Sequence, residues 1–192
     1  QSIDDVHTVV ERYEQLGVSQ IVALRGDPPT GIDAPYTSHP DGYHRTSDLA
    51  ATVADRFEVS VSAYPERHPQ SPTFGHDLDV LAGKVAAGAT RAMTQMFFDN
   101  HSFFTYRDAV RTRGIDVALV PGIFPIHSFP AVARFAARCG AVMPTWIADR
   151  FAGLDDDPAG THAVAAEVAA EQIAELAANG AEHVHIYTLN RA

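Results

Sequence analysis

Apolar residues recur along this chain in two alternating patterns, one typical of amphipathic helices and one typical of buried strands. The first segment has helical spacing, with apolar residues at Ile3, Val6, Val9, Val10, Tyr13 and Leu16. Ser2 and Asp5, at the start of this segment, have the spacing of a capping box, and Gly17 follows its end. The pattern therefore predicts a helix that begins near residue 3 and ends before Gly17.

Short apolar runs with strand character alternate with further helical patterns along the rest of the chain. The predicted strands cover residues 18–24, 58–64, 90–97, 116–120 and 183–189. The predicted helices cover residues 47–57, 76–87, 102–113, 128–151 (as one or two helices) and 155–178. Such alternation is typical of right-handed βαβ units in a parallel sheet. No linker divides the chain, so we expect residues 1–192 to form a single domain.

Each predicted strand ends in a cluster of polar residues, glycines and prolines. The clusters are LRGD at 24–27, AYPE at 63–66, TQMFFD at 94–99, VPGIFP at 120–125 and YTLNR at 187–191. The carboxyl ends of parallel strands meet on the face where α/β enzymes hold their ligands. Strand ends are also polar simply because they meet loops, but this does not explain recurring acid, amide and guanidinium groups. The pattern indicates the site of a small-molecule enzyme.

Several common kinds of site have no motif in this chain. The glycine-rich dinucleotide fingerprint, the P-loop, the G-x-S-x-G elbow and the H-E-x-x-H metal motif are all absent. His183 and His185 share one strand face but lack a nearby third ligand, so we expect no metal site. The single cysteine, Cys139, fits a small residue at a helix end better than a nucleophile.

Charge and composition narrow the choice of partners. The formal net charge is -10 and no basic cluster occurs, which argues against nucleic acid or an anionic membrane as the partner. No apolar run approaches the roughly 20 residues of a membrane span, and no signal peptide is visible. One cysteine cannot form an internal disulfide, so we expect a reducing, cytoplasmic location.

Six segments, in order, resemble the methylenetetrahydrofolate reductase family. They are IVALRGDPP at 21–29, VSVSAYPERHP at 59–69, KVAAGATRAMTQMFFD at 84–99, VPGIFPI at 120–126, GLDDD at 153–157 and IYTLNRA at 186–192. The resemblance implies a (β/α)8 TIM barrel that binds FAD and forms a homo-oligomer. The flavin would pass a hydride from NAD(P)H to 5,10-methylenetetrahydrofolate, giving 5-methyltetrahydrofolate.

The resemblance also implies that only part of the barrel is present. The five predicted strands match the fourth to the eighth strand of the family. Nothing in the chain matches the first three strands, which include a strand carrying the glutamate that acts as general acid. Five parallel strands cannot close a barrel. We therefore expect a piece of a longer enzyme, cut before Gln1, with little or no reductase activity by itself.

The family pattern assigns roles around the cofactor residue by residue. Asp27 would lie beside the flavin ring and the pterin, where its carboxylate stabilises the cationic iminium form of the folate and tunes the flavin potential. Arg25 and Gly26 would contact the cofactor, since a glycine permits close approach of the backbone. Further cofactor contacts would come from Tyr64, His68, Ser71, Asp77 and Lys84, the last by offsetting phosphate charge.

The substrate residues follow from the same resemblance. Gln95 would hydrogen-bond the pterin, because an amide offers both a donor and an acceptor. Arg191 would bind the folate, and Phe135 would pack on the substrate or the nicotinamide. The central expectation is that Asp27 and Gln95 meet at the mouth of one cavity.

Simpler interpretations stand beside these assignments. Arg25 and Asp27 could form a structural ion pair, and Gln95 could cap its strand. His68 could order its loop, and Phe135 could belong to the core.

Two other function classes also remain open. One is a different barrel enzyme, such as an aldolase, although the only lysine, Lys84, lies in a helical pattern. The other is a non-catalytic binding remnant of the reductase fold.

Overall fold

Five parallel strands alternate with seven helices in the computed structural model, which describes residues 1–26, 28 and 36–189. In chain order the elements are α1 Ile3–Gln15, β1 Gln20–Ala23, α2 Thr46–Val53, β2 Glu58–Ala63, α3 Phe74–Ala86, β3 Ala89–Met96, α4 Asn100–Thr112, β4 Ala118–Ile123, α5 Phe129–Arg138, α6 Thr145–Phe151, α7 Pro158–Ala178 and β5 His185–Ile186. The predicted alternation is confirmed, and the predicted segment 128–151 forms two helices, α5 and α6.

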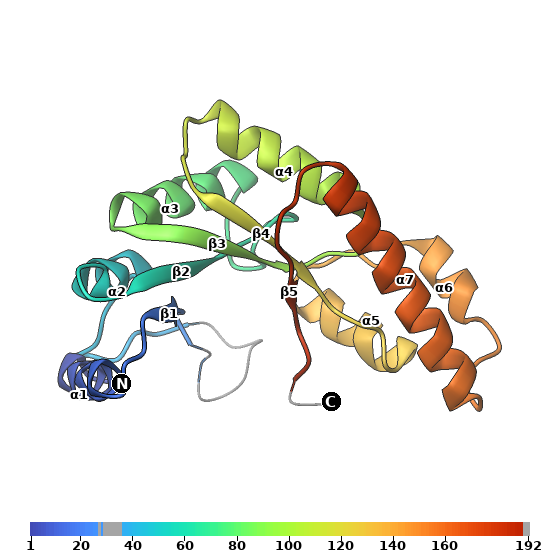
Figure 1. Cartoon of the computed structure of the whole chain (residues 1–192), viewed down its shortest axis with the longest axis horizontal. Coiled ribbons are helices and arrows are strands. Elements are labelled where there is room, and N and C mark those ends of the chain that lie inside the picture. Colours follow the sequence, from blue (N-terminus) through green and yellow to red (C-terminus); the bar gives the residue numbers. More distant parts are fainter. Residues whose placement is uncertain (27, 29–35, 190–192) are drawn as a thin grey trace.

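The sheet has the strand order β1-β2-β3-β4-β5, and every neighbouring pair is parallel. Strands that pair in sequence order and are joined by helices form the wall of a βα barrel. Figure 1 shows this sheet curling, with α2, α3, α4 and α7 along its outer side. The fold is therefore a part of a (β/α)8 barrel, as the sequence predicts.

Local sequence explains where several helices begin. Ser2 accepts a hydrogen bond from the Asp5 amide at 3.1 Å, and Asp5 accepts one from the Ser2 amide at 3.0 Å, which completes the predicted capping box. Thr73 caps α3 in the same way by accepting from the His76 amide at 3.0 Å. Gly17 has a φ of +75° just after α1, as a helix stop requires.

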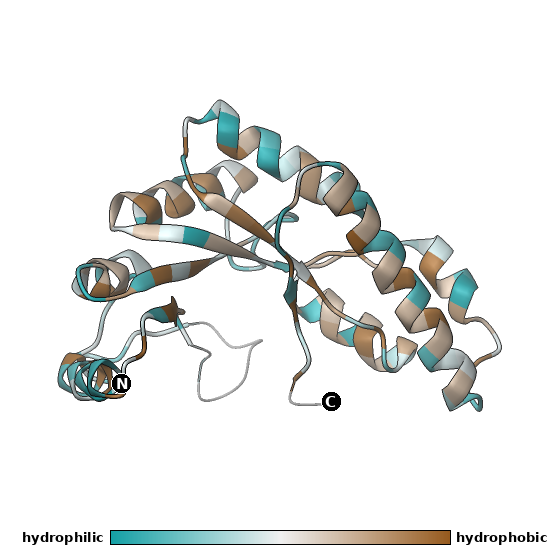
Figure 2. Ribbon diagram, viewed as in Figure 1, coloured by the Kyte–Doolittle hydropathy of each residue, from teal (hydrophilic) through white to brown (hydrophobic). Residues whose placement is uncertain are grey.

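A large part of the core lies between the central strands and the helices that cover them. Val59, Val61 and Ala92 have no exposed surface and pack with helices α2, α3 and α4. Figure 2 shows hydrophobic residues concentrated along β2 and β4, whereas hydrophilic residues alternate with them on α4 and α7. These central strands fix the positions of the loops at their carboxyl ends.

The two outer strands differ from their predicted form. The first was expected to be buried, but only Ala23 of β1 is, and Val22 is 50% exposed. β1 pairs with β2 along one edge, and no strand in the described part of the chain pairs with its other edge. The last strand was expected over residues 183–189, but its ladder with β4 covers only His185 and Ile186.

β4 extends beyond its predicted end. Its backbone stays extended through Pro121 and Gly122 because the Gly122 amide donates to Thr94 Oγ1 at 2.8 Å. None of the helices in the described part of the chain combines the length and hydrophobicity needed to cross a membrane.

Candidate active site

The carboxyl ends of β1, β2 and β3 surround a cavity of about 210 Å³, here called the mouth cavity. Its lining includes five of the predicted site residues, from three different strand ends and loops. The described lining residues are Leu24, Arg25, Gly26, Ser62, Tyr64, His68, Pro69, Gln70, Gln95, Arg138 and Cys139. The clusters that the sequence places at separate strand ends thus meet in one place.

A second cavity of about 180 Å³, the lysine cavity, adjoins the first between β2 and α3. It shares Arg25, Ser62, Tyr64, His68 and Gln70 with the mouth cavity. Its other described lining residues are Thr46, Ala63, Ser71, His76, Asp77, Val80, Leu81 and Lys84. All the predicted cofactor residues that the structure describes therefore line one or both of these cavities.

A third cavity of about 130 Å³, the loop cavity, lies between α1 and the segment before α2. Arg25 lines it too, and Thr46 joins it to the lysine cavity. The Arg25 guanidinium lies 4.2 Å from the centre of the Tyr36 ring, a cation–π contact that orients it. Arg25 consequently lines three cavities that adjoin one another through shared lining residues.

Lys84 is a buried cation at the wall of the lysine cavity. Its ammonium donates to the Ser62 carbonyl oxygen at 2.8 Å and to Ser62 Oγ at 3.1 Å, and the residue is only 5% exposed. Burial is the main cause that lowers the pKa of Lys84 to about 8; Asp77 acts in the opposite direction, and Arg25 acts with burial. A cation held mainly by neutral oxygens is suited to an anionic ligand.

His68 is fixed between Tyr64 and Asp77. The His68 amide donates to Asp77 Oδ2 at 2.9 Å, and its Nδ1 accepts from the Gln70 amide at 3.0 Å. The rings of Tyr64 and His68 meet edge to face with centres 4.7 Å apart. Burial lowers the pKa of His68, Arg25 and Lys84 act in the same direction, and Asp77 opposes them. Because Nδ1 accepts from the Gln70 amide, Nε2 is the ring nitrogen that can donate.

Ser71 and Asp77 are held by the same loop. Ser71 Oγ donates to the Thr73 carbonyl oxygen at 3.2 Å, which orders the approach to α3. Both residues are buried and both line the lysine cavity. The side-chain hydrogen bonds described for both residues go to backbone groups of the protein, so a contact with a cofactor would come in addition to them.

Gln95 lies at the end of β3 and lines the mouth cavity with Arg25 and Gly26. Its Oε1 accepts from the Met96 amide at 3.0 Å, so the strand-capping interpretation is correct as far as it goes. That bond fixes the oxygen and leaves the NH₂ group as the donor for a ligand. Gly26 has a φ of +69°, and a Cβ there would meet no atom of the described residues within 4 Å.

Phe135 lies on α5, half-buried, with its ring centre 5.8 Å from that of Phe124. Tyr187, after β5, stacks on Phe124 at 6.2 Å and donates through its hydroxyl to the Thr94 carbonyl oxygen at 2.8 Å. Burial raises the pKa of Tyr187 to about 12. Phe135 is thus part of an aromatic cluster and lines none of the three cavities.

Sequence reasoning missed Gln70 and Arg138, and it gave Tyr187, a member of the strand-end cluster at 187–191, no role of its own. Arg138 and Cys139, at the carboxyl end of α5, reach the mouth cavity although they follow no strand directly. Tyr187 lies inside the family-like segment at 186–192, which is the signal that could have found it. Nothing local in the sequence marks Arg138.

Two predicted residues, Asp27 and Arg191, lie outside the described residues, so the expected meeting of Asp27 with Gln95 stays a prediction. Cys139 is buried at the end of α5, where a small residue was expected. Among the described residues, no group of three histidine, cysteine, aspartate or glutamate side chains could hold a metal ion.

Comparison with known proteins gives a consistent result. The family model described as methylenetetrahydrofolate reductase matches residues 1–192. The 5,10-methylenetetrahydrofolate reductase of Escherichia coli (strain K12) is 42% identical over 192 residues, which cover 98% of this chain and 62% of that protein. The reductase of Salmonella typhimurium is 40% identical over 189 residues, which cover 98% of this chain and 62% of that protein. The chain thus spans about three fifths of the length of these relatives.

A solved structure shares the fold. It is an uncharacterized protein from Clostridium thermocellum that binds two copies of 5-methyl-5,6,7,8-tetrahydrofolic acid. It superposes with a TM-score of 0.53 at 14% identity, covering 92% of this chain and 61% of that one. At this identity the likeness concerns the architecture alone.

Proposed function

The chain belongs to the methylenetetrahydrofolate reductase family, and we propose that it forms part of an FAD-dependent enzyme that reduces 5,10-methylenetetrahydrofolate to 5-methyltetrahydrofolate with NAD(P)H. The observation that carries this proposal is the set of three adjoining cavities, the mouth, lysine and loop cavities, all lined by Arg25. A dinucleotide is an extended ligand with a flat ring, a charged middle and a second ring, and it suits a series of adjoining cavities.

The residues that line these cavities fit the parts of FAD. The buried ammonium of Lys84 and the guanidinium of Arg25 offer positive charge for the pyrophosphate. Gly26 allows the flavin ring to approach the backbone, and His68 can donate through Nε2 because its Nδ1 accepts from the Gln70 amide. Tyr64, Ser71 and Asp77 complete the wall. When bound, FAD supplies the hydride carrier between NAD(P)H and the folate.

The folate would be held at the mouth cavity. The Gln95 amide donates to the pterin, and its position is set by the bond to the Met96 amide. From the family resemblance, Asp27 stabilises the cationic iminium form of the substrate and Arg191 binds the folate. Phe135 contributes an aromatic face one helical turn from Arg138.

The wider setting is also proposed. Residues 1–192 would act as one domain that completes its barrel with three further strands in a longer, homo-oligomeric enzyme. The single cysteine fits a reducing cytoplasm. Lys84 lies on α3 rather than on a strand end, which disfavours a Schiff-base aldolase.

Flavin spectroscopy on the complete polypeptide that contains this chain tests the proposal. We expect a yellow protein that NADH or NADPH bleaches under anaerobic conditions and that methylenetetrahydrofolate recolours. Gln95→Ala should leave bleaching unchanged and weaken folate binding about tenfold, as loss of one well-placed hydrogen bond implies. A protein that takes up no flavin, or a reduced flavin that the folate cannot reoxidise, would contradict the proposal.

A further inference from the structure

Arg138 is an arginine on the mouth cavity to which the family pattern assigns no role. It lies at the carboxyl end of α5, is exposed, and borders the cavity from a helix rather than from a strand end. Gln95 lines the same cavity from the end of β3 and is half-buried. A guanidinium and an amide therefore border one space, the first on an exposed residue and the second on a more buried one.

The position of Arg138 is held by contacts from another loop. The Val142 amide, just after α5, donates to Glu66 Oε2 at 3.1 Å, and Ser102 donates to the other oxygen of Glu66 at 3.3 Å. Gly140 packs so closely on the loop after β2 that a Cβ there would lie 3.1 Å from the Arg67 carbonyl oxygen. The end of α5 is thus fixed at the mouth cavity before any ligand binds, which favours binding.

Two arginines, Arg25 and Arg138, line the mouth cavity, and its other described lining residues carry no carboxylate. A guanidinium has five N–H donors, so it can bind a carboxylate of a ligand and keep a hydrogen bond to another group of the protein. Arg138 is an exposed residue and Gln95 is half-buried, so a ligand that contacts both would have its outer end at Arg138.

We propose that Arg138 binds the carboxylates of the glutamyl tail of the folate, with the pterin held deeper by Gln95. This inference rests on the proposed function, since it requires the folate to enter the mouth cavity. The tail is the charged end of that substrate, and it points to solvent when the pterin faces the flavin. A phosphate of NAD(P)H is the competing anion.

The test compares Arg138→Gln with Arg134→Gln, a matched control on the same helix that lines none of the three cavities. Both variants are made in the complete FAD-loaded polypeptide. Calorimetry measures the affinity for 5-methyltetrahydrofolate and for 6-methyltetrahydropterin, which lacks the tail. Steady-state assays with menadione as acceptor measure the KM for NADH.

We expect Arg138→Gln to raise the Kd for 5-methyltetrahydrofolate about tenfold and Arg134→Gln to leave it unchanged. The Kd for the tail-free pterin and the KM for NADH should stay constant, and Arg138→Lys should recover part of the affinity. A normal folate affinity in Arg138→Gln, or an effect on NADH alone, would overturn the inference while leaving the reductase proposal intact. A wild type that binds no folate would contradict both.

Discussion

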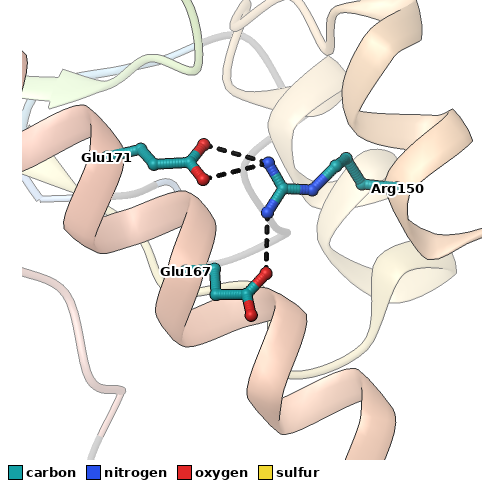
Figure 3. A network of polar contacts seen from close by, with 3 residues as sticks. All are labelled: Arg150, Glu167 and Glu171. Carbon is teal, nitrogen blue, oxygen red and sulfur yellow. Dashed lines mark hydrogen bonds and ion pairs between the residues drawn. The ribbon is translucent and has the colours of Figure 1, made fainter.

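Lys84 on α3 and Arg150 on α6 are both long cationic side chains held by oxygen atoms, but their surroundings are opposite. Lys84 is 5% exposed and both of its described bonds go to the neutral Ser62. The Arg150 side chain is 31% exposed and bonds Glu167 at 2.9 Å and Glu171 at 2.9 Å and 3.3 Å (Figure 3). One cation borders a cavity, and the other joins two helices at the surface.

The difference shows in how each site affects ionisation. Burial lowers the pKa of Lys84, whereas the hydrogen bond to Glu171 is the main cause that raises the pKa of Arg150. The surface arginine is therefore satisfied by the protein itself. The buried lysine is held in a charged form that the protein only partly compensates, which is expected where an anionic ligand supplies the remainder.

Lys84→Met should have the largest effect on the cofactor. Loss of a charge-assisted hydrogen bond to phosphate should weaken FAD binding about 100-fold. Flavin fluorescence titration of the apo protein measures this change. Arg150→Met, titrated in parallel, should bind FAD with unchanged affinity. If Lys84→Met bound FAD as tightly as the wild type, the lysine cavity would not be the phosphate site.

The apo protein should also become more stable as the pH rises. The folded-state pKa of Lys84 is about 8, below its ordinary value of 10.5, so between these values the unfolded chain holds the proton more tightly. The buried charge of Lys84 lowers the free energy of unfolding by its full amount below pH 8, and this effect disappears above pH 10.5. Urea unfolding at pH 8 and pH 10 should therefore show a rise of about 2 kcal/mol relative to Lys84→Met.

Lys84 is the only lysine in the chain, so this difference isolates one group. Tyrosines that titrate at high pH are present in both proteins and cancel in the comparison. Parallel pH profiles for the two proteins would show that Lys84 has an ordinary pKa and that its burial is compensated.

The sequence predicted features that depend on residues close to one another in the chain. Alternation of strand and helix patterns predicted the parallel sheet, and Ser2 with Asp5 predicted the start of α1. The family-like segments assigned Lys84 to the cofactor and Gln95 to the pterin, and both residues line cavities, while their roles stay predictions. The strand-end clusters meet as predicted because strand direction alone decides on which edge of the sheet the loops lie.

Features that depend on distant pairing could not be predicted. Glu66 and Val142 are 76 residues apart, and their bond sets the end of α5 and so the place of Arg138. The exposure of Val22 depends on which strand lies beside β1, and no pattern within 18–24 contains that information. The pairing of Arg150 with Glu167 and Glu171 likewise requires α6 to pack on α7.

Ser62→Ala should affect FAD binding less than Lys84→Met does, and it tests how far Ser62 stabilises the buried ammonium. It removes the Oγ acceptor at 3.1 Å and leaves the carbonyl oxygen at 2.8 Å, so Lys84 keeps its position with less stabilisation of its charge. The pKa of Lys84 should fall further, and FAD affinity at pH 8 should drop about threefold. Measuring FAD affinity from pH 6 to pH 9 should show the loss beginning at lower pH than in the wild type. An unshifted profile would mean that Oγ does not stabilise the ammonium.

Arg150→Met should give the smallest effect, although it removes the larger number of bonds. Exposed ion pairs contribute little because water and salt compete for both partners. We expect the midpoint of thermal unfolding to fall by at most about 2 °C, and by less in 0.5 M salt, with FAD affinity unchanged. A large fall that persists in high salt would show that the α6–α7 contact depends on this arginine through packing rather than through charge.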